Sequence, residues 1–241
     1  MRKEERHQIK RDDLATLLER AGLFIEDNLR SVVLSAAVLA LLVVAGLTLR
    51  GWLSSREQRS SLLLGELIET FATPASPSPE ERQQLPVGVP SFASASERDS
   101  KVLEQAEAIL ARHGSASVAP KALYYKALAL ADLRRYDEAA AALDEILMKY
   151  SRDFLAPMAR YQLARMREVQ GKPNEAIVQF QVLTETSGGL FPREEALLGI
   201  ARCQEAMGQR AEALKTYMRI LDEFPESEYL GEARNKVQEL S

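Results

Sequence analysis

The sequence feature that most constrains the fold is a period of 37 residues in the C-terminal half of the chain. Small residues recur at this spacing in two columns, and large residues recur in a third column four positions after the second. Because all three columns keep one register, we interpret them as a single repeated structural unit. The columns are Ala127, Ala164 and Ala201; Ala139, Ala176 and Ala213; and Leu143, Phe180 and Tyr217.

A period of about 34 to 40 residues, with helical spacing of apolar residues inside each unit, is typical of arrays of helical hairpins. Two helices that cross closely need Ala or Gly at the crossing, because their axes lie only about 8–10 Å apart. A single hairpin cannot bury its apolar face, so neighbouring hairpins must stack on it. The sequence therefore predicts an all-α fold in which hairpins follow one another along the chain.

In their order and spacing these columns resemble the tetratricopeptide repeat. A unit of that family has a small residue in its first helix, a tight turn, and then an alanine and a large residue in its second helix. Its late proline is present here only as Pro225. The resemblance implies a right-handed array with three repeats over residues 120–225, closed by a capping helix at 227–240 with Ser227 as its N-cap. The turn positions are Arg134, Gly171 and Gly208.

A leading repeat, split by a loop, is predicted in residues 55–113. Its first helix is expected over residues 55–71, with Gly65 as the small residue at the crossing. Five of the ten prolines follow within residues 73–96, a loop that cannot be helical throughout. A second helix is expected over residues 97–113. Together with the three full units, this gives about three and a half repeats.

An apolar segment, Ser31–Leu49, is predicted to span a membrane as a helix within residues 31–50. It contains no charged residue and lies between Arg30 and Arg50. A helix of this length covers roughly the 30 Å hydrocarbon core, and Trp52 follows where an indole ring is favoured at the interface. A cleaved signal peptide is the alternative, but the segment is longer than the usual apolar region and its N-terminal flank is too acidic.

The charged N-terminal tail, residues 1–30, contains a short amphipathic helical pattern. It carries seven basic and seven acidic residues, so strong attraction to anionic lipid is not expected. Close to the other end of the apolar segment the basic residues are Arg50, Arg56 and Arg59. Because basic residues favour the cytoplasmic side, the excess in the tail predicts a cytoplasmic N-terminus and repeats beyond the membrane.

Composition and side-chain chemistry argue against nucleic-acid binding and against catalysis. The net charge is -4, and no basic stripe stands out in the repeats. Only two histidines occur, His7 and His113, and no Cys/His cluster has the spacing of metal ligands. The one cysteine, Cys203, excludes an intramolecular disulfide and is interpreted as a small apolar side chain on a helix. We predict no catalytic residue, no metal and no cofactor.

Binding of protein segments is the better-supported function. In the resembling family the first helix of each repeat lines a groove, and the corresponding positions here include adaptable Tyr and Met side chains. Each arginine among them is expected to pair along its own helix, Arg165 with Glu168 and Arg202 with Glu205; simple neutralised surface pairs are the alternative interpretation. Tyr, Leu and Arg stand where some members hold a carboxylate with Lys and Asn, so a clamp of that kind is not predicted. The predicted groove residues are Lys121, Tyr124, Leu128, Asp132, Met158, Tyr161, Arg165, Glu168, Leu198, Arg202 and Glu205, with Ala131, Val169, Glu195 and Ala206 at the other groove positions.

The order of parts carries a second resemblance. A charged tail with the pattern LLERAGLFIEDN at residues 17–28, one spanning helix and a degenerate repeat domain resemble the bacterial ancillary subunits of the SecYEG translocon. This implies an inner-membrane protein with periplasmic repeats, and it implies the protein-conducting channel, periplasmic chaperones or envelope clients as partners. The predicted function is a non-catalytic, membrane-anchored interaction module. The alternative is an envelope scaffold or cell-division coordinator that forms homo-oligomers through its N-terminal helix and anchor.

Overall fold

The computed structural model of the chain describes residues 29–75, 91–114, 116–185 and 191–241. These residues are all-α apart from an isolated bridge between Ala75 and Phe92. The chain divides into two units, residues 1–56 and 57–241. Most of the predicted N-terminal tail and of the predicted proline-rich loop lies outside the described residues.

Helix α2, Leu29–Ala72, runs without a break from the first unit into the second. By length and composition, its part from Ala37 onward could cross a membrane. The apolar side chains that the structure describes in the first unit are exposed, as Leu41 illustrates with 69% exposure. In the second unit one side of the helix is buried, and Leu64 and Leu67 are 6% and 0% exposed. The same helix therefore provides both an exposed apolar segment and part of a protein core.

Helix α4, Ala95–His113, begins at a capped N-terminus. The Ser94 hydroxyl accepts a hydrogen bond from the Glu97 N–H at 3.1 Å, and the Glu97 carboxylate accepts one from the Ala93 N–H at 2.9 Å. Such reciprocal bonds satisfy N–H groups that a helix start leaves free. The helix shares a core cluster with α2 and with α5, Ala119–Asp132. Its buried members are Leu64, Leu67, Val102, Ala106, Ile109, Val118, Ala122 and Ala129.

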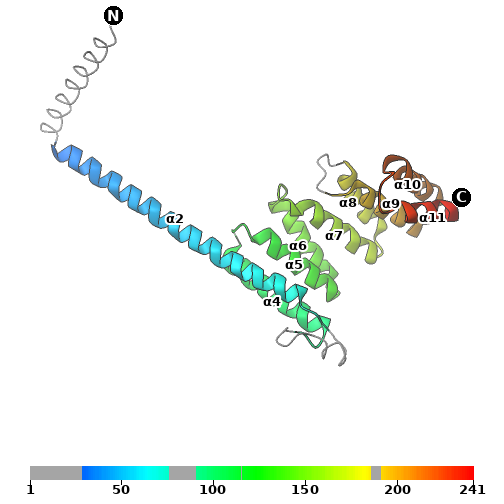
Figure 1. Ribbon diagram of the computed structural model, residues 1–241, viewed down its shortest axis with the longest axis horizontal. Helices are drawn as coiled ribbons and strands as arrows, with labels where there is room; N and C mark the ends of the chain where they lie inside the picture. Colours follow the sequence, from blue (N-terminus) through cyan, green and yellow to red (C-terminus); the bar gives the residue numbers. More distant parts are fainter. Residues whose placement is uncertain (1–28, 76–90, 115, 186–190) are drawn as a thin grey trace, which may run out of the picture. The chain divides into compact units, whose positions relative to one another are not determined.

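Three helical hairpins follow in chain order, as Figure 1 shows from green to brown. Each helix packs on its neighbour in the chain, and the first helices of successive hairpins also touch, α5 on α7 and α7 on α9. The predicted all-α stack of hairpins is therefore confirmed. The hairpins are α5 with α6 (Tyr136–Lys149), α7 (Leu155–Val169) with α8 (Pro173–Glu185), and α9 (Arg193–Ala206) with α10 (Arg210–Glu223); α11 (Leu230–Leu240) packs on α10.

The three periodic columns form the core of these hairpins. All nine of their side chains are 0% exposed, which is the burial expected where small residues permit a close crossing and large ones fill the remaining space. The turns keep the same register. Gly171 and Gly208 have φ values of 70° and 72°, and Arg134 adopts φ 60° at the equivalent position of the first hairpin.

Two local expectations are wrong. Gly65 does not lie at a helix crossing: it is exposed, and a Cβ built on it would have nothing within 4 Å, because its neighbours Leu64 and Leu67 make the contact. Ser227 is not the N-cap of the last helix. Its hydroxyl accepts a hydrogen bond from the Tyr229 N–H at 3.2 Å in the turn before α11. The helix begins at the residue that follows Tyr229.

Candidate protein-binding surface

The predicted groove residues on α5 are linked to α7 through polar and aromatic contacts. The half-buried Tyr124 hydroxyl accepts a hydrogen bond from Gln162 Nε2 at 3.5 Å, and burial raises the pKa of Tyr124. The Lys121 ammonium lies 5.9 Å from the ring centroid of Phe154, a cation–π distance. Leu128, one turn after Tyr124 on the same helix, is half-buried. Residues of adjacent first helices therefore lie together, as the transferred positions require.

Asp132 ends α5 beside the N-terminal part of α4. Its carboxylate is 3.7 Å from the Arg98 guanidinium, which also holds the buried Asp99 at 2.8 Å. Burial, with a smaller contribution from the Asp99 charge, raises the pKa of Asp132. These residues and Arg134 line a cavity of about 410 Å³. Asp132 therefore contacts the leading repeat and not α7.

Tyr161 on α7 is part of an aromatic cluster. Its ring centroid is 5.9 Å from that of Phe180 and 4.8 Å from that of Phe191. Burial, followed by a hydrogen bond with Glu195, raises the pKa of Tyr161 to about 12. Met158, one turn earlier on the helix, is 42% exposed. Tyr161 thus contributes mainly to packing, whereas Met158 is available for contact.

The two arginines at the same register position share one glutamate. Arg165 Nη1 contacts Glu168 at 2.9 Å on its own helix, as expected, but Arg202 Nε contacts Glu168 at 3.1 Å across from α9. The expected pairing of Arg202 with Glu205 is therefore wrong. The reason is the stacking itself, because α9 packs against α7 and brings Arg202 within reach of the preceding repeat.

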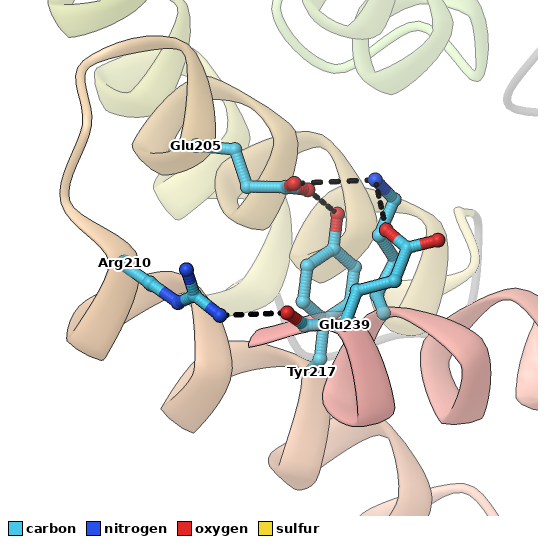
Figure 2. A network of polar contacts seen from close by, with 5 residues as sticks. Glu205, Arg210, Tyr217 and Glu239 are labelled. Atoms are coloured by element: carbon cyan, nitrogen blue, oxygen red, sulfur yellow. Dashed lines mark hydrogen bonds and ion pairs between the residues drawn. The ribbon is translucent and has the colours of Figure 1, made fainter. Parts of the chain in front are cut away.

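Glu205 instead binds residues on the C-terminal side. Figure 2 shows the Tyr217 hydroxyl pointing at the Glu205 carboxylate, to which it donates a hydrogen bond at 2.5 Å. Lys236 on α11 contacts the other carboxylate oxygen at 3.2 Å. Burial, with the hydrogen bond to Glu205, raises the pKa of Tyr217. Glu205 therefore connects the last hairpin to α11.

Leu198 and Cys203 on α9 belong to the core. Leu198, one of the predicted groove residues, is 2% exposed and packs in the cluster around Phe180 and Tyr217. Cys203 is fully buried in the same cluster, and burial raises its pKa to about 11. Among the described residues, no three His, Cys, Asp or Glu side chains are grouped as metal ligands would be.

Phe154 and Phe191 were not among the predicted groove residues, although the sequence contained a signal for them. The two are 37 residues apart and so form a further column of the repeat. Phe154 is 55% exposed, whereas Phe191 is half-buried against Tyr161. Lys236 has no such signal, because α11 lies outside the periodic units.

Comparison with known protein families identifies the repeated unit. Residues 195–227, which contain most of α9 and all of α10, match the model of the tetratricopeptide repeat. These residues form one tetratricopeptide repeat. No curated protein matches the sequence of the chain.

Several solved structures are similar to this chain. MamA 41-end from Desulfovibrio magneticus RS-1 is 15% identical, with TM-score 0.43 over 59% of this chain and 80% of that one. PilW, a widely conserved type IV pilus biogenesis factor, is 20% identical, with TM-score 0.46 over 60% of each chain. A putative kinesin light chain from Podosopora anserina, with nearly identical TPR-like repeats, is 17% identical, with TM-score 0.44 over 70% of this chain and 93% of that one.

Tetratricopeptide repeats expose an extended surface along their stacked helices, and such surfaces bind other proteins. The repeat module of this chain is accordingly a protein-interaction module. The contacts described above divide its first helices into two parts. Ion pairs and hydrogen bonds connect α7, α9 and α11, whereas apolar side chains are exposed near the start of α7.

Proposed function

We propose that this tetratricopeptide-repeat protein is a single-pass protein of the bacterial inner membrane, with a cytoplasmic N-terminus and periplasmic repeats. Its first helices α5, α7 and α9 bind segments of other proteins near the export or envelope-assembly machinery. The observation that carries the proposal is the continuity of α2, whose apolar segment and first array helix are one helix. A chain built in this way holds its repeats at the membrane where new envelope proteins emerge.

Tethering makes weak recognition sufficient. A partner and a repeat module held at one membrane meet at high effective concentration, so modest affinity for each segment produces substantial occupancy. The resemblance of residues 17–28 to the ancillary translocon subunits favours the protein-conducting channel, periplasmic chaperones or envelope clients as partners. The proposed action is binding alone, without catalysis, metal or cofactor.

A crosslinking experiment tests which face binds. A photoreactive amino acid is placed in the full-length chain at Met158 or Asp132 on the first helices, and at Met148 or Val178 on the second helices. All four side chains are exposed, so a partner can reach each of them. We expect partner proteins to be captured in cells from Met158 and Asp132 only. Capture from Met148 and Val178 alone would contradict binding by the first helices.

The alternative, an oligomeric scaffold, is tested by deleting residues 1–50. A scaffold that associates through its N-terminal helix and anchor loses self-association, whereas an interaction module keeps its contacts with soluble partners. Topology is tested separately by protease treatment of intact spheroplasts. Digestion of the repeats is expected, and their protection would overturn the periplasmic placement.

A further inference from the structure

The leading repeat takes its first helix from outside the 37-residue register. One period before α5 lies at residues 82–95. The helix that shares a core with α4 and α5 is instead the end of α2, which finishes at Ala72. Residues 73–94 connect it to α4, whereas the connections from α4 onward are three to seven residues long. We call residues 57–72 the array half of α2.

The array half of α2 is held by long side chains. In the described part of the chain, helices α4 to α11 pack on their neighbours through close approach of their backbones, and α2 approaches α4 and α5 less closely. Leu64 and Leu67 are buried in the contact, and the Phe71 ring meets the Tyr125 ring edge to face, with centroids 5.2 Å apart. The Arg98 guanidinium lies 5.4 Å from the centroid of the Phe71 ring. Without a small residue at a crossing, the contact depends on the ends of these side chains.

The surface beneath the array half of α2 requires a helix to cover it. Val102 and Ile109 on α4 and Ala122 on α5 share the core cluster with α2 and are 0%, 1% and 0% exposed. Together with Tyr125 we call these residues the α2 groove. A chain from which α2 has departed would place the apolar side chains of the groove in water, which is unfavourable. The groove is therefore complete only when an α2 helix occupies it.

The structure shows directly which helix fits the α2 groove. Leu64, Leu67 and Phe71 follow one another at spacings of three and four residues, which places them on one side of the helix. At the other end of the contact, the Ser117 hydroxyl donates a hydrogen bond to the Glu57 carboxylate. A second copy of the chain carries the same helix and can make the same contacts. Exchange of an identical element between copies therefore costs little free energy.

We propose that two copies of this chain exchange their α2 helices, so that the array half of α2 from one copy occupies the α2 groove of the other. A flexible connection of this length holds α2 at its own groove with an effective concentration of only about 1 mM. Chains anchored in one membrane also meet at high local concentration, so the α2 of another copy competes for the groove. The inference goes beyond the proposed function, because binding of partner segments by the first helices does not require exchange.

Crosslinking between two differently tagged full-length copies, expressed in the same cells, tests the exchange. Both copies carry Cys203→Ala, which introduces the residue found at the same register in Ala129. One copy carries Glu57→Cys and the other Ser117→Cys, so a short bismaleimide joins them when α2 of the first copy lies in the groove of the second. A single chain with both cysteines is the positive control. We expect about tenfold more crosslinked pairs than with Val178→Cys, at an exposed position on α8, in place of Ser117→Cys.

Complementary substitutions separate exchange from association of copies side by side. Leu67→Asp in one copy keeps its α2 out of every groove, and Val102→Arg in the other copy blocks its groove, because each substitution buries a charge without a partner. The α2 of the Val102→Arg copy can then dock only on the groove of the Leu67→Asp copy. With Glu57→Cys on the Val102→Arg copy and Ser117→Cys on the other, we expect about tenfold more crosslinking than with the two cysteines interchanged.

The two arrangements of the cysteines contain the same groove and α2 substitutions, so the folding of the chains is matched. Equal yields in the two arrangements, or no crosslink in either while both chains accumulate, would overturn the exchange. If the charged variants do not accumulate, Leu67→Ala and Val102→Phe allow the same comparison. Either result leaves the binding of partners by the first helices standing. Deleting residues 1–50 retains the array half of α2, so crosslinking that persists in the shortened chains does not arise from the anchor.

Discussion

Gly199 on α9 makes room for the buried ring of Phe180. A Cβ at Gly199 would lie 2.5 Å from the ring, and the ring is fully enclosed by the core cluster. Gly199→Ala is therefore expected to destabilise the array by about 1–3 kcal/mol, the usual cost of overpacking. Urea unfolding followed by circular dichroism measures this.

The matched control is Gly231→Ala on α11. Gly231 also lies in a helix, but a Cβ there would have nothing within 4 Å. Since Ala is the better helix former, this variant should gain about 0.5–1 kcal/mol. If both variants shift the urea midpoint in the same direction, the close approach of Phe180 is not the reason why Gly199 must be a glycine.

Tyr161 makes stability depend on pH under alkaline conditions. Its pKa is about 12 in the folded chain because of burial, against 10.0 for the free side chain. Between these values the unfolded chain has lost the proton while the folded chain keeps it, so stability falls as pH rises from 10 to 12. Tyr161→Phe should show a shallower fall in urea midpoint over this range. A variant curve parallel to that of the original chain would contradict this role.

At the residue scale the sequence predicted buried positions better than polar partners. The periodic columns could be recognised because burial repeats every time the same helix crossing repeats. The partner of Arg202 could not be predicted in this way, because pairing with Glu205 on its own helix and pairing with Glu168 on α7 both fit the sequence. Only the packing of α9 on α7 decides between them.

Helix α11 is fastened at its C-terminal end by Arg210 of α10. Figure 2 shows the guanidinium reaching the end of α11, where it donates to the carbonyls of Glu239 at 2.7 Å and Leu240 at 3.0 Å. The last carbonyls of a helix have no partner within the helix, so these bonds satisfy groups that water would otherwise solvate.

Arg210→Ala is expected to loosen the last turn of α11. Loss of these bonds should cost about 1 kcal/mol, which corresponds to roughly fivefold faster amide exchange in that turn. Hydrogen–deuterium exchange with mass spectrometry reads this out. Arg219→Ala, also on α10, removes only an exposed ion pair with Glu223 at 2.9 Å and should leave α11 unchanged. Equal exchange in the two variants would show that Arg210 does not hold the helix.

Element boundaries were predictable where proline or glycine marks them, as at Gly171 and Gly208. Element boundaries were harder to predict where the chain turns without proline or glycine. Arg134 adopts a left-handed conformation that favours glycine, yet the turn forms because the hairpin on either side is fixed by burial. Ser227 has the residue type of an N-cap but bonds within the preceding turn.

The second unit extends into α2, so a substitution in this N-terminal helix should weaken the whole array. Leu67 is 0% exposed between α4 and α5, while its neighbour Ile68 is 38% exposed. Leu67→Ala should destabilise the array by about 2–5 kcal/mol through the cavity it leaves. Ile68→Ala should cost less than about 1 kcal/mol. Similar thermal unfolding of the two variants would mean that this part of α2 is not part of the core.

The continuity of α2 also fixes an order of events during synthesis. Leu67 leaves the ribosome about 35 residues ahead of Val102, the next member of the same core cluster. At about 5–20 residues per second this interval lasts several seconds. During that time the apolar side of the helix has no partner from its own chain, so it is then that a chaperone could bind to it.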